Sequence, residues 1–166
     1  LLADTAERLF LKKPEKIIAV TGTNGKSSVA NFYYQILKLN KIKVASIGTL
    51  GVHYNNKFIK TLNTTADSIT INKLLQKIKK NGVNNAIMEA SSHGLKQNRL
   101  DGIKFNVGIF TNLSRDHLDY HSSYADYFNS KMILFKKLMY NKSYIIYDKE
   151  IDVSNSIKKI VNKKFL

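Results

Sequence analysis

The sequence predicts an α/β fold with a phosphate-binding loop, built on a mostly parallel sheet with helices on both faces. The first observation is a glycine-rich stretch from Val20 to Ser28, which follows an apolar run and opens a segment with helical periodicity. The second is that further short apolar runs alternate with helical segments along the chain. The third is that polar residues follow the ends of these runs, where parallel sheets bind their ligands.

The elements can be placed in order from their periodicity. A strand at about 16–21 leads into the glycine-rich stretch, and a helix then runs to about Leu39 with an apolar stripe that includes Phe32 and Ile36. Two later helices are expected, one ending at Asn81-Gly82 and one from Ser122 or Ser123 to about Tyr140. The remaining strands are expected at 43–47, 86–88, 105–111 and 143–147, with a surface hairpin at 52–61.

Composition excludes several classes of protein. With 166 residues, 43% of them hydrophobic, the chain is neither disordered nor fibrous, and no apolar run approaches the roughly 20 residues of a membrane span. It has no cysteine and no signal peptide, so we expect a cytoplasmic protein without a membrane segment. The net charge of +15 is spread along the chain, so we expect no nucleic-acid partner, although the charge leaves that alternative open.

The glycine-rich stretch has the chemistry of a phosphate site. Glycines let backbone amides approach phosphate oxygens, Lys26 can reach the terminal phosphates, and the Ser27 hydroxyl can hold Mg²⁺. Val20 stands where the general pattern has its first glycine, so the loop is a shortened version. The alternative is a tight turn that binds no ligand.

Two charged regions follow later strands. Glu89 comes directly after the run 86–88 and is a natural Mg²⁺ ligand, unless it is an ordinary solvated loop residue. The segment from Asn112 to His121 contains eight polar or ionisable side chains, among which His117 could bind a metal or transfer a proton. His121 is the weaker candidate.

Lys131 occupies a position within the apolar stripe of its helix. An inward lysine is costly unless it is paired, neutral or modified, and the alternative is that its amine reaches the surface. Arg99, beside Gln97, could clamp a phosphate or a carboxylate, although its spacing alone does not require this.

Together these motifs resemble the Mur ligase family, whose members use ATP to add amino acids to the UDP-sugar peptide precursor of the bacterial cell wall. The loop is similar to the Gly-Thr-Asn-Gly-Lys-(Thr/Ser) loop of that family. The resemblance implies that ATP contacts Gly22, Thr23, Asn24, Gly25, Lys26, Ser27, Ser28 and Asn112. It implies that the UDP-MurNAc-dipeptide contacts Asn63, Thr64, Thr65, Ser91, Gln97 and Arg99. It also implies that Mg²⁺ is held by Ser27, Glu89, His117 and a carboxylated Lys131, and that the catalytic residues are Lys26, Glu89, His117 and Lys131.

Within the family, Met88 to Leu95 and Asn112 to His121 resemble the members that add the third amino acid. Those members join meso-diaminopimelate or L-lysine to UDP-MurNAc-L-Ala-D-Glu through an acyl phosphate. Ala66 departs from the family pattern, which has proline there. The alternatives are another ligase of this type, such as folylpolyglutamate synthetase, and a phosphate-loop NTPase that acts on nucleic acid.

The resemblance also implies a domain organisation. We expect residues 1–148 to be an incomplete central ATP-binding domain and 149–166 to be a tail of unassigned role, with the family's N-terminal and C-terminal domains absent. Such a fragment is expected to be a monomer that does not complete catalysis alone.

Overall fold

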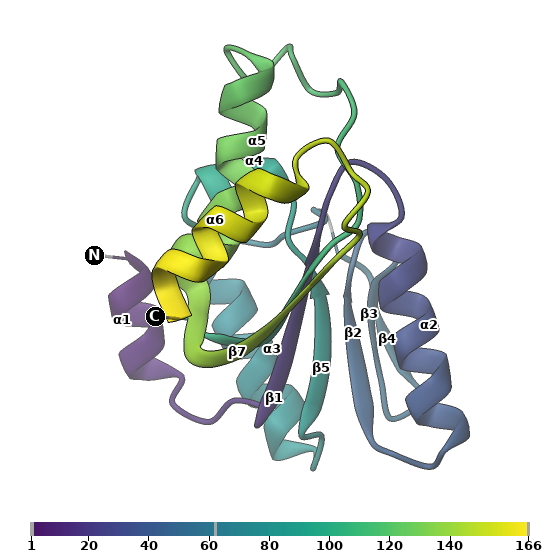
Figure 1. Ribbon diagram of the computed structural model, residues 1–166. Coiled ribbons are helices and arrows are strands. Elements are labelled where there is room, and N and C mark those ends of the chain that lie inside the picture. The colour runs from purple at the N-terminus through teal and green to yellow at the C-terminus, as the bar shows by residue number, and fades with distance from the viewer. Residues whose placement is uncertain (1, 62, 166) are drawn as a thin grey trace.

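The computed structural model describes residues 2–61 and 63–165, and the side chains of residues 5–61 and 63–160. Its centre is a seven-stranded sheet in the order β4-β3-β2-β5-β1-β6-β7 (Figure 1). Every pairing among the last five strands in that order is parallel, whereas β3 and β4 pair antiparallel at one edge. The parallel strands are β1 (Lys16–Thr21), β2 (Val44–Gly48), β5 (Asn85–Glu89), β6 (Phe105–Phe110) and β7 (Met139–Tyr147).

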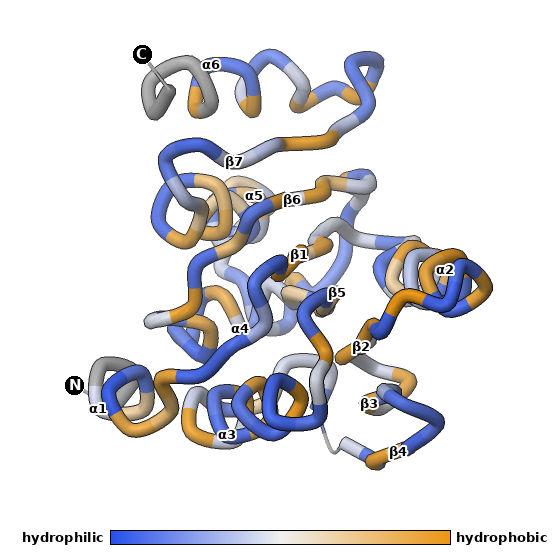
Figure 2. The backbone as a smooth tube through the Cα atoms, turned by 90° about the horizontal axis from the view of Figure 1, so that it is seen from below, coloured by the Kyte–Doolittle hydropathy of each residue, from blue (hydrophilic) through white to orange (hydrophobic). Residues whose placement is uncertain are grey.

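Helices cover both faces of this sheet, which confirms the predicted fold class. Figure 2 shows α2 (Lys26–Leu39) on one side, where the side chains of β1 and β5 pack against Ala30. The opposite side holds the larger core, to which α3 (Ser68–Lys80), α4 (Ser92–Lys96) and α5 (Tyr124–Ile133) contribute buried residues, and α1 (Leu2–Leu9) lies beside α3. The short helix α4 follows β5 directly.

The predicted hairpin is present, and it belongs to the sheet. β3 (Gly51–Tyr54) and β4 (Lys57–Ile59) are joined by Asn55 and Asn56, which both have positive φ, as asparagine tolerates in a tight turn. β3 pairs with β2, so the hairpin extends the sheet at its edge.

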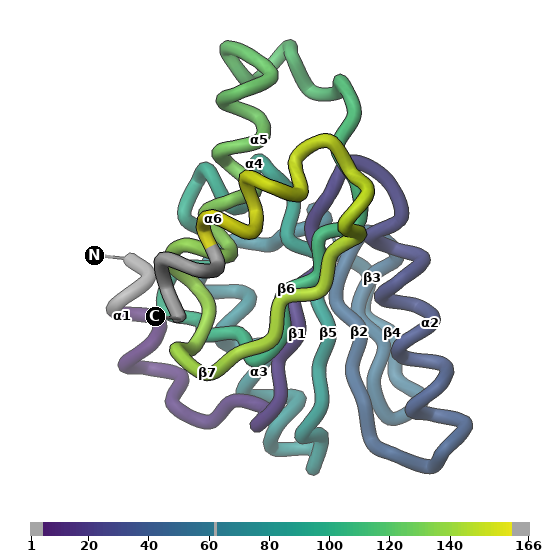
Figure 3. Tube along the Cα trace, viewed as in Figure 1, coloured from purple at the N-terminus to yellow at the C-terminus, as the bar shows by residue number. Residues whose placement is uncertain are grey.

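The helix predicted to reach Tyr140 ends earlier. α5 stops at Ile133, a π-helical turn η1 (Leu134–Leu138) follows, and Met139 already begins β7. Met139 pairs with Phe105 of β6, so the chain must leave the helix before Tyr140 to enter the sheet. Figure 3 traces β6 and β7 side by side along this edge.

The expected stripe on α2 is also partly wrong. Phe32 is 61% exposed and Ile36 is 57% exposed, whereas Ala30 is buried and Val29 and Tyr33 pack against the sheet. The helix therefore contacts the sheet through the face that carries Val29, Ala30 and Tyr33, and Phe32 and Ile36 lie outside this face.

The final helix α6 (Ser154–Phe165) lies within the predicted tail. Its Ile157 is fully buried in the larger core, so this part of the tail packs on the domain. The domain boundary at residue 148 stays a prediction. None of the helices among the described residues has the length and hydropathy of a transmembrane segment.

Candidate active site

A cavity of about 550 Å³ lies at the carboxyl ends of the parallel strands. Fifteen of the seventeen predicted site residues line it, and the two exceptions are Gly22 and Asn112. The predicted lining residues are Thr23, Asn24, Gly25, Lys26, Ser27, Ser28, Asn63, Thr64, Thr65, Glu89, Ser91, Gln97, Arg99, His117 and Lys131. Thr49, Ser92 and His93 complete the lining and had not been predicted. The structure thus brings the predicted residues together, while their roles stay predictions.

The phosphate loop joins β1 to α2. Gly25 precedes the first turn of α2 with φ 83°, a left-handed conformation that favours glycine, and no described side chain caps the helix. A helix start of this kind attracts anions through its unpaired amides and its dipole. Lys26 Nζ donates to Gly22 O (3.0 Å) and to Thr23 O (2.6 Å), and burial lowers the pKa of Lys26. The lysine is therefore folded back on its own loop.

Asn112 supports the loop from outside the cavity lining. The Asn24 amide donates to Asn112 Oδ1 (2.9 Å), the Asn112 side-chain amide donates to Asn24 O (3.3 Å), and the Thr23 amide donates to Asn112 O (3.0 Å). Gly22 lies on the same side, where a Cβ would meet Thr111 Oγ1 at 2.0 Å. Contact of Gly22 and Asn112 with a nucleotide stays a prediction, and their observed contacts support the loop.

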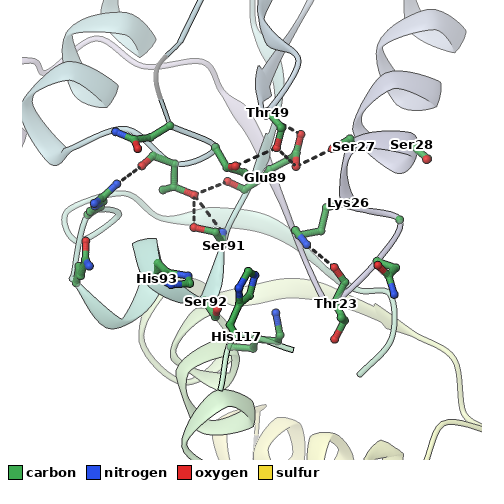
Figure 4. A pocket seen from close by; sticks show the side chains of 18 residues that line it. Thr23, Lys26, Ser27, Ser28, Thr49, Glu89, Ser91, Ser92, His93 and His117 are labelled. Atoms are coloured by element: carbon green, nitrogen blue, oxygen red, sulfur yellow. Dashed lines mark hydrogen bonds between the residues drawn. The ribbon is translucent and has the colours of Figure 1, made fainter. Parts of the chain in front are cut away.

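Glu89 is held at the end of β5 by three donors (Figure 4). Ser27 Oγ donates to Oε2 (3.0 Å), and Thr49 donates through its amide to Oε1 (2.9 Å) and through its hydroxyl to Oε2 (3.1 Å). A Cβ on Gly48 would lie 2.1 Å from Oε1, so glycine is required there for the carboxylate to fit. The signal for Thr49 in the sequence was its position directly after the glycine that ends the second strand.

The opposite part of the cavity is built around Thr65. Its hydroxyl donates to Glu89 O (3.0 Å) and accepts from the Ser91 amide (3.1 Å), and Arg99 Nη1 donates to Thr65 O (2.7 Å). Ser91 also caps α4 by accepting from the Gly94 amide (3.1 Å). Three of the six residues predicted to bind substrate, Thr65, Ser91 and Arg99, therefore form one hydrogen-bonded unit next to Glu89.

Lys131 points into the protein, and its amine does not reach the surface. The residue is 1% exposed, Nζ donates to Gly22 O (2.7 Å), and Nζ lies 4.2 Å from the centre of the Tyr127 ring. Burial, reinforced by the nearby charge of Lys26, lowers the pKa of Lys131 to about 7. The buried Tyr127 hydroxyl in turn donates to Thr23 Oγ1 (3.1 Å), which ties α5 to the phosphate loop.

Histidines line the wall beside Lys131. His117 has a left-handed backbone (φ 52°), and its Nε2 lies 3.5 Å from Asp116 Oδ2. Its ring meets His93 edge-on with the ring centres 4.8 Å apart, and His93 lies against Tyr120 at 4.0 Å. Burial lowers the pKa of His93, which favours its neutral form.

The donor set fits a hard cation at one position. Ser27 Oγ and the Glu89 carboxylate are oxygen donors that line the cavity beside the phosphate loop, as Mg²⁺ prefers. Among the residues that the structure describes, no three His, Asp or Glu side chains converge as a metal site. Lys131 as an ammonium group is not a ligand, so its predicted role in holding Mg²⁺ requires the carboxylation.

Comparison with known proteins agrees with this geometry. Residues 20–166 match the family described as the Mur ligase middle domain. The chain is 41% identical over 166 residues to the UDP-N-acetylmuramoyl-L-alanyl-D-glutamate–2,6-diaminopimelate ligase of Rickettsia bellii, covering 98% of this chain and 35% of that protein. Over 127 residues it is 47% identical to the ligase of the same name from Leptospira interrogans, covering 76% of this chain and 25% of that protein. The chain thus spans between a quarter and about a third of the length of these relatives.

Solved structures show the same fold. A structure of a UDP-N-acetylmuramoyl-L-alanyl-D-glutamate–2,6-diaminopimelate ligase superposes with a TM-score of 0.82 and 30% identity, covering 98% of this chain and 32% of that one. Since the match to the middle domain extends over most of the sequence, the chain belongs to the Mur ligase family.

Proposed function

We propose that this chain is the ATP-binding part of an enzyme that adds meso-diaminopimelate to UDP-MurNAc-L-Ala-D-Glu. The observation that carries the proposal is the shared cavity, in which a phosphate loop, a buried carboxylate and the Thr65–Ser91–Arg99 unit adjoin one another. The names of the relatives support the choice of this substrate and amino acid over L-lysine.

The phosphate loop would bind ATP with its γ-phosphate toward Glu89. Lys26 exchanges its contacts with the loop carbonyls for phosphate oxygens, and the start of α2 adds its amides. On the other side, Thr65, Ser91 and Arg99 orient the dipeptide. A carboxylate oxygen of its D-Glu attacks the γ-phosphorus, the bond from that phosphorus to the β–γ bridging oxygen breaks, and ADP and an acyl phosphate form.

The amino acid then completes the amide bond. Its neutral amine attacks the acyl carbon, phosphate leaves with the electrons of the carbon–oxygen bond, and the nitrogen loses a proton. The protein contributes positioning and charge neutralisation, which supply most of the rate enhancement in phosphoryl transfer. When Mg²⁺ is bound, it neutralises phosphate charge, and Ser27, Glu89, His117 and a carboxylated Lys131 are the residues that would hold it.

The test is a product assay on the full-length protein. With ATP, Mg²⁺, UDP-MurNAc-L-Ala-D-Glu and meso-diaminopimelate, we expect equal amounts of UDP-MurNAc-tripeptide and ADP, measured by mass spectrometry and chromatography. In one parallel reaction L-lysine replaces meso-diaminopimelate. In another, a folate and glutamate replace both the dipeptide and the amino acid. Lys26→Met should abolish both products, whereas the same change at the exposed Lys136 should not.

A nucleic-acid enzyme would give a different result. ATP hydrolysis that rises strongly on adding RNA or DNA, falls with salt, and ignores the UDP-MurNAc-dipeptide would overturn the proposal.

A further inference from the structure

His121 is a buried histidine that lies between α4 and α5. Its side chain is fully buried, although its two ring nitrogens are polar. Nε2 lies 3.0 Å from Ser92 Oγ, and Nδ1 lies 3.5 Å from both Ser130 Oγ and Asp126 Oδ2. The ring therefore connects the first residue of α4 to two residues of α5.

The two helices that His121 connects carry different parts of the site. Ser92 follows Ser91, whose side chain caps α4 and whose amide binds Thr65 on the proposed dipeptide side. Ser130 precedes Lys131, which reaches the phosphate loop. A shift of α4 against α5 would thus change the distance between the substrate-binding unit and Lys131.

Other contacts at this interface depend on the same alignment. Lys96 of α4 forms a salt bridge with Asp126 of α5, and Asp126 also accepts from the Ser122 amide (3.1 Å). The Tyr120 and Tyr127 rings pack on His121 with centres 4.9 Å and 5.2 Å away. Ser130 Oγ donates to Asp126 O (2.8 Å), so toward His121 Nδ1 it can only accept, and Nε2 is left to accept from Ser92 Oγ. Because a fully buried ring nitrogen without a partner is costly, both ends of the ring favour this one arrangement.

We propose that His121 is a positioning residue that sets the register between α4 and α5, and thereby between the dipeptide-binding unit and Lys131. The inference rests on the proposed function for its kinetic consequence only. His121 does not line the cavity, so it acts through Ser92 and Ser130. The phosphate loop touches neither serine in the contacts described, and His121 meets it only through the Tyr127 ring, whose hydroxyl binds Thr23 by itself, so ATP binding should depend less on His121 than dipeptide binding does.

The test uses His121→Phe, which keeps the ring volume and removes both polar contacts, in the full-length protein. We expect kcat to fall about tenfold or more and KM for the dipeptide to rise, because small misplacements of reacting groups are costly. The Kd for ATP should stay within about twofold. His121→Gln, whose amide can reach Ser92, should recover most of the loss, and His53→Phe at the far edge of the sheet is the matched control.

A double variant separates positioning from simple stability. Ser92→Ala alone should reproduce part of the loss in kcat. Combined with His121→Phe it should lower kcat little further, because both changes remove the same contact between His121 and Ser92. A folded His121→Phe protein with wild-type kcat and KM, and merely a lower melting temperature, would overturn the proposal.

A readout without turnover distinguishes this failure from that of the proposed function. In His121→Phe, amide hydrogen exchange of Gly94 and of α5 should accelerate relative to wild type and to His53→Phe. If exchange accelerates in His121→Phe but the wild-type protein shows no ligase activity, the positioning role of His121 stands and the proposed function fails. If exchange is unchanged, the positioning role itself is refuted.

Discussion

Replacing Lys131 with methionine should remove a pH dependence from the stability of the fold. The folded protein releases the Lys131 proton near pH 7, whereas the unfolded chain keeps it to about pH 10.5. Since the unfolded state binds more protons across this window, the free energy of unfolding rises with pH in the wild type. At roughly 1.4 kcal/mol for each pH unit, the gain from pH 7 to 10.5 is on the order of 5 kcal/mol.

The measurement compares two curves, because other lysines and tyrosines also titrate in this range. Urea unfolding would be followed by far-ultraviolet circular dichroism, since the chain has no tryptophan. Buffers should be free of bicarbonate, which would carboxylate the neutral amine. As pH rises across this window, the free energy of unfolding of the wild type should increase more steeply than that of Lys131→Met. Lys136→Met, at an exposed lysine of the following turn, is the control. Parallel curves for the wild type and Lys131→Met would refute the reasoning.

Three further changes test other parts of the site. Gly48→Ala should lower kcat/KM about 100-fold in the product assay, because the new Cβ would lie 2.1 Å from Glu89 Oε1 and displace the carboxylate; activity near wild type would show that Glu89 need not stay in place. Tyr127→Phe removes only the hydroxyl that donates to Thr23, so KM for ATP should rise severalfold with little change in KM for the dipeptide, and an equal rise in both would contradict this separation. Lys26→Met should weaken ATP binding about tenfold or more in calorimetry, because it removes a charged donor that can exchange the loop carbonyls for phosphate oxygens; undiminished ATP affinity would exclude a phosphate contact.

Local sequence signals located most of the fold and the cavity. Strands in this fold are short apolar runs, and parallel packing brings their carboxyl ends together, so Glu89 and the phosphate loop could be expected to meet. Lys131 was detectable because a charged residue interrupted an apolar stripe, and the structure buries it.

The missed features depend on tertiary contacts. Phe32 and Ile36 have helical spacing, but which side of a helix faces the sheet is decided by packing. Thr49 is a common residue in a loop, and its role follows from the distance to a carboxylate forty positions away. The early end of α5 is set by the pairing of Met139 with Phe105, which no local pattern indicates.

The carbonyl oxygen of Gly22 accepts from both Lys26 and Lys131, and this shared acceptor couples two events in the site. A nucleotide that draws Lys26 toward its phosphates leaves the oxygen to Lys131 and takes a repelling charge away from it. Such a nucleotide changes the proton affinity of Lys131. By thermodynamic reciprocity, any change in the charge of Lys131 must alter nucleotide affinity by the same factor. Through one backbone oxygen, the charge of Lys131 on α5 is thereby coupled to the nucleotide affinity of the phosphate loop.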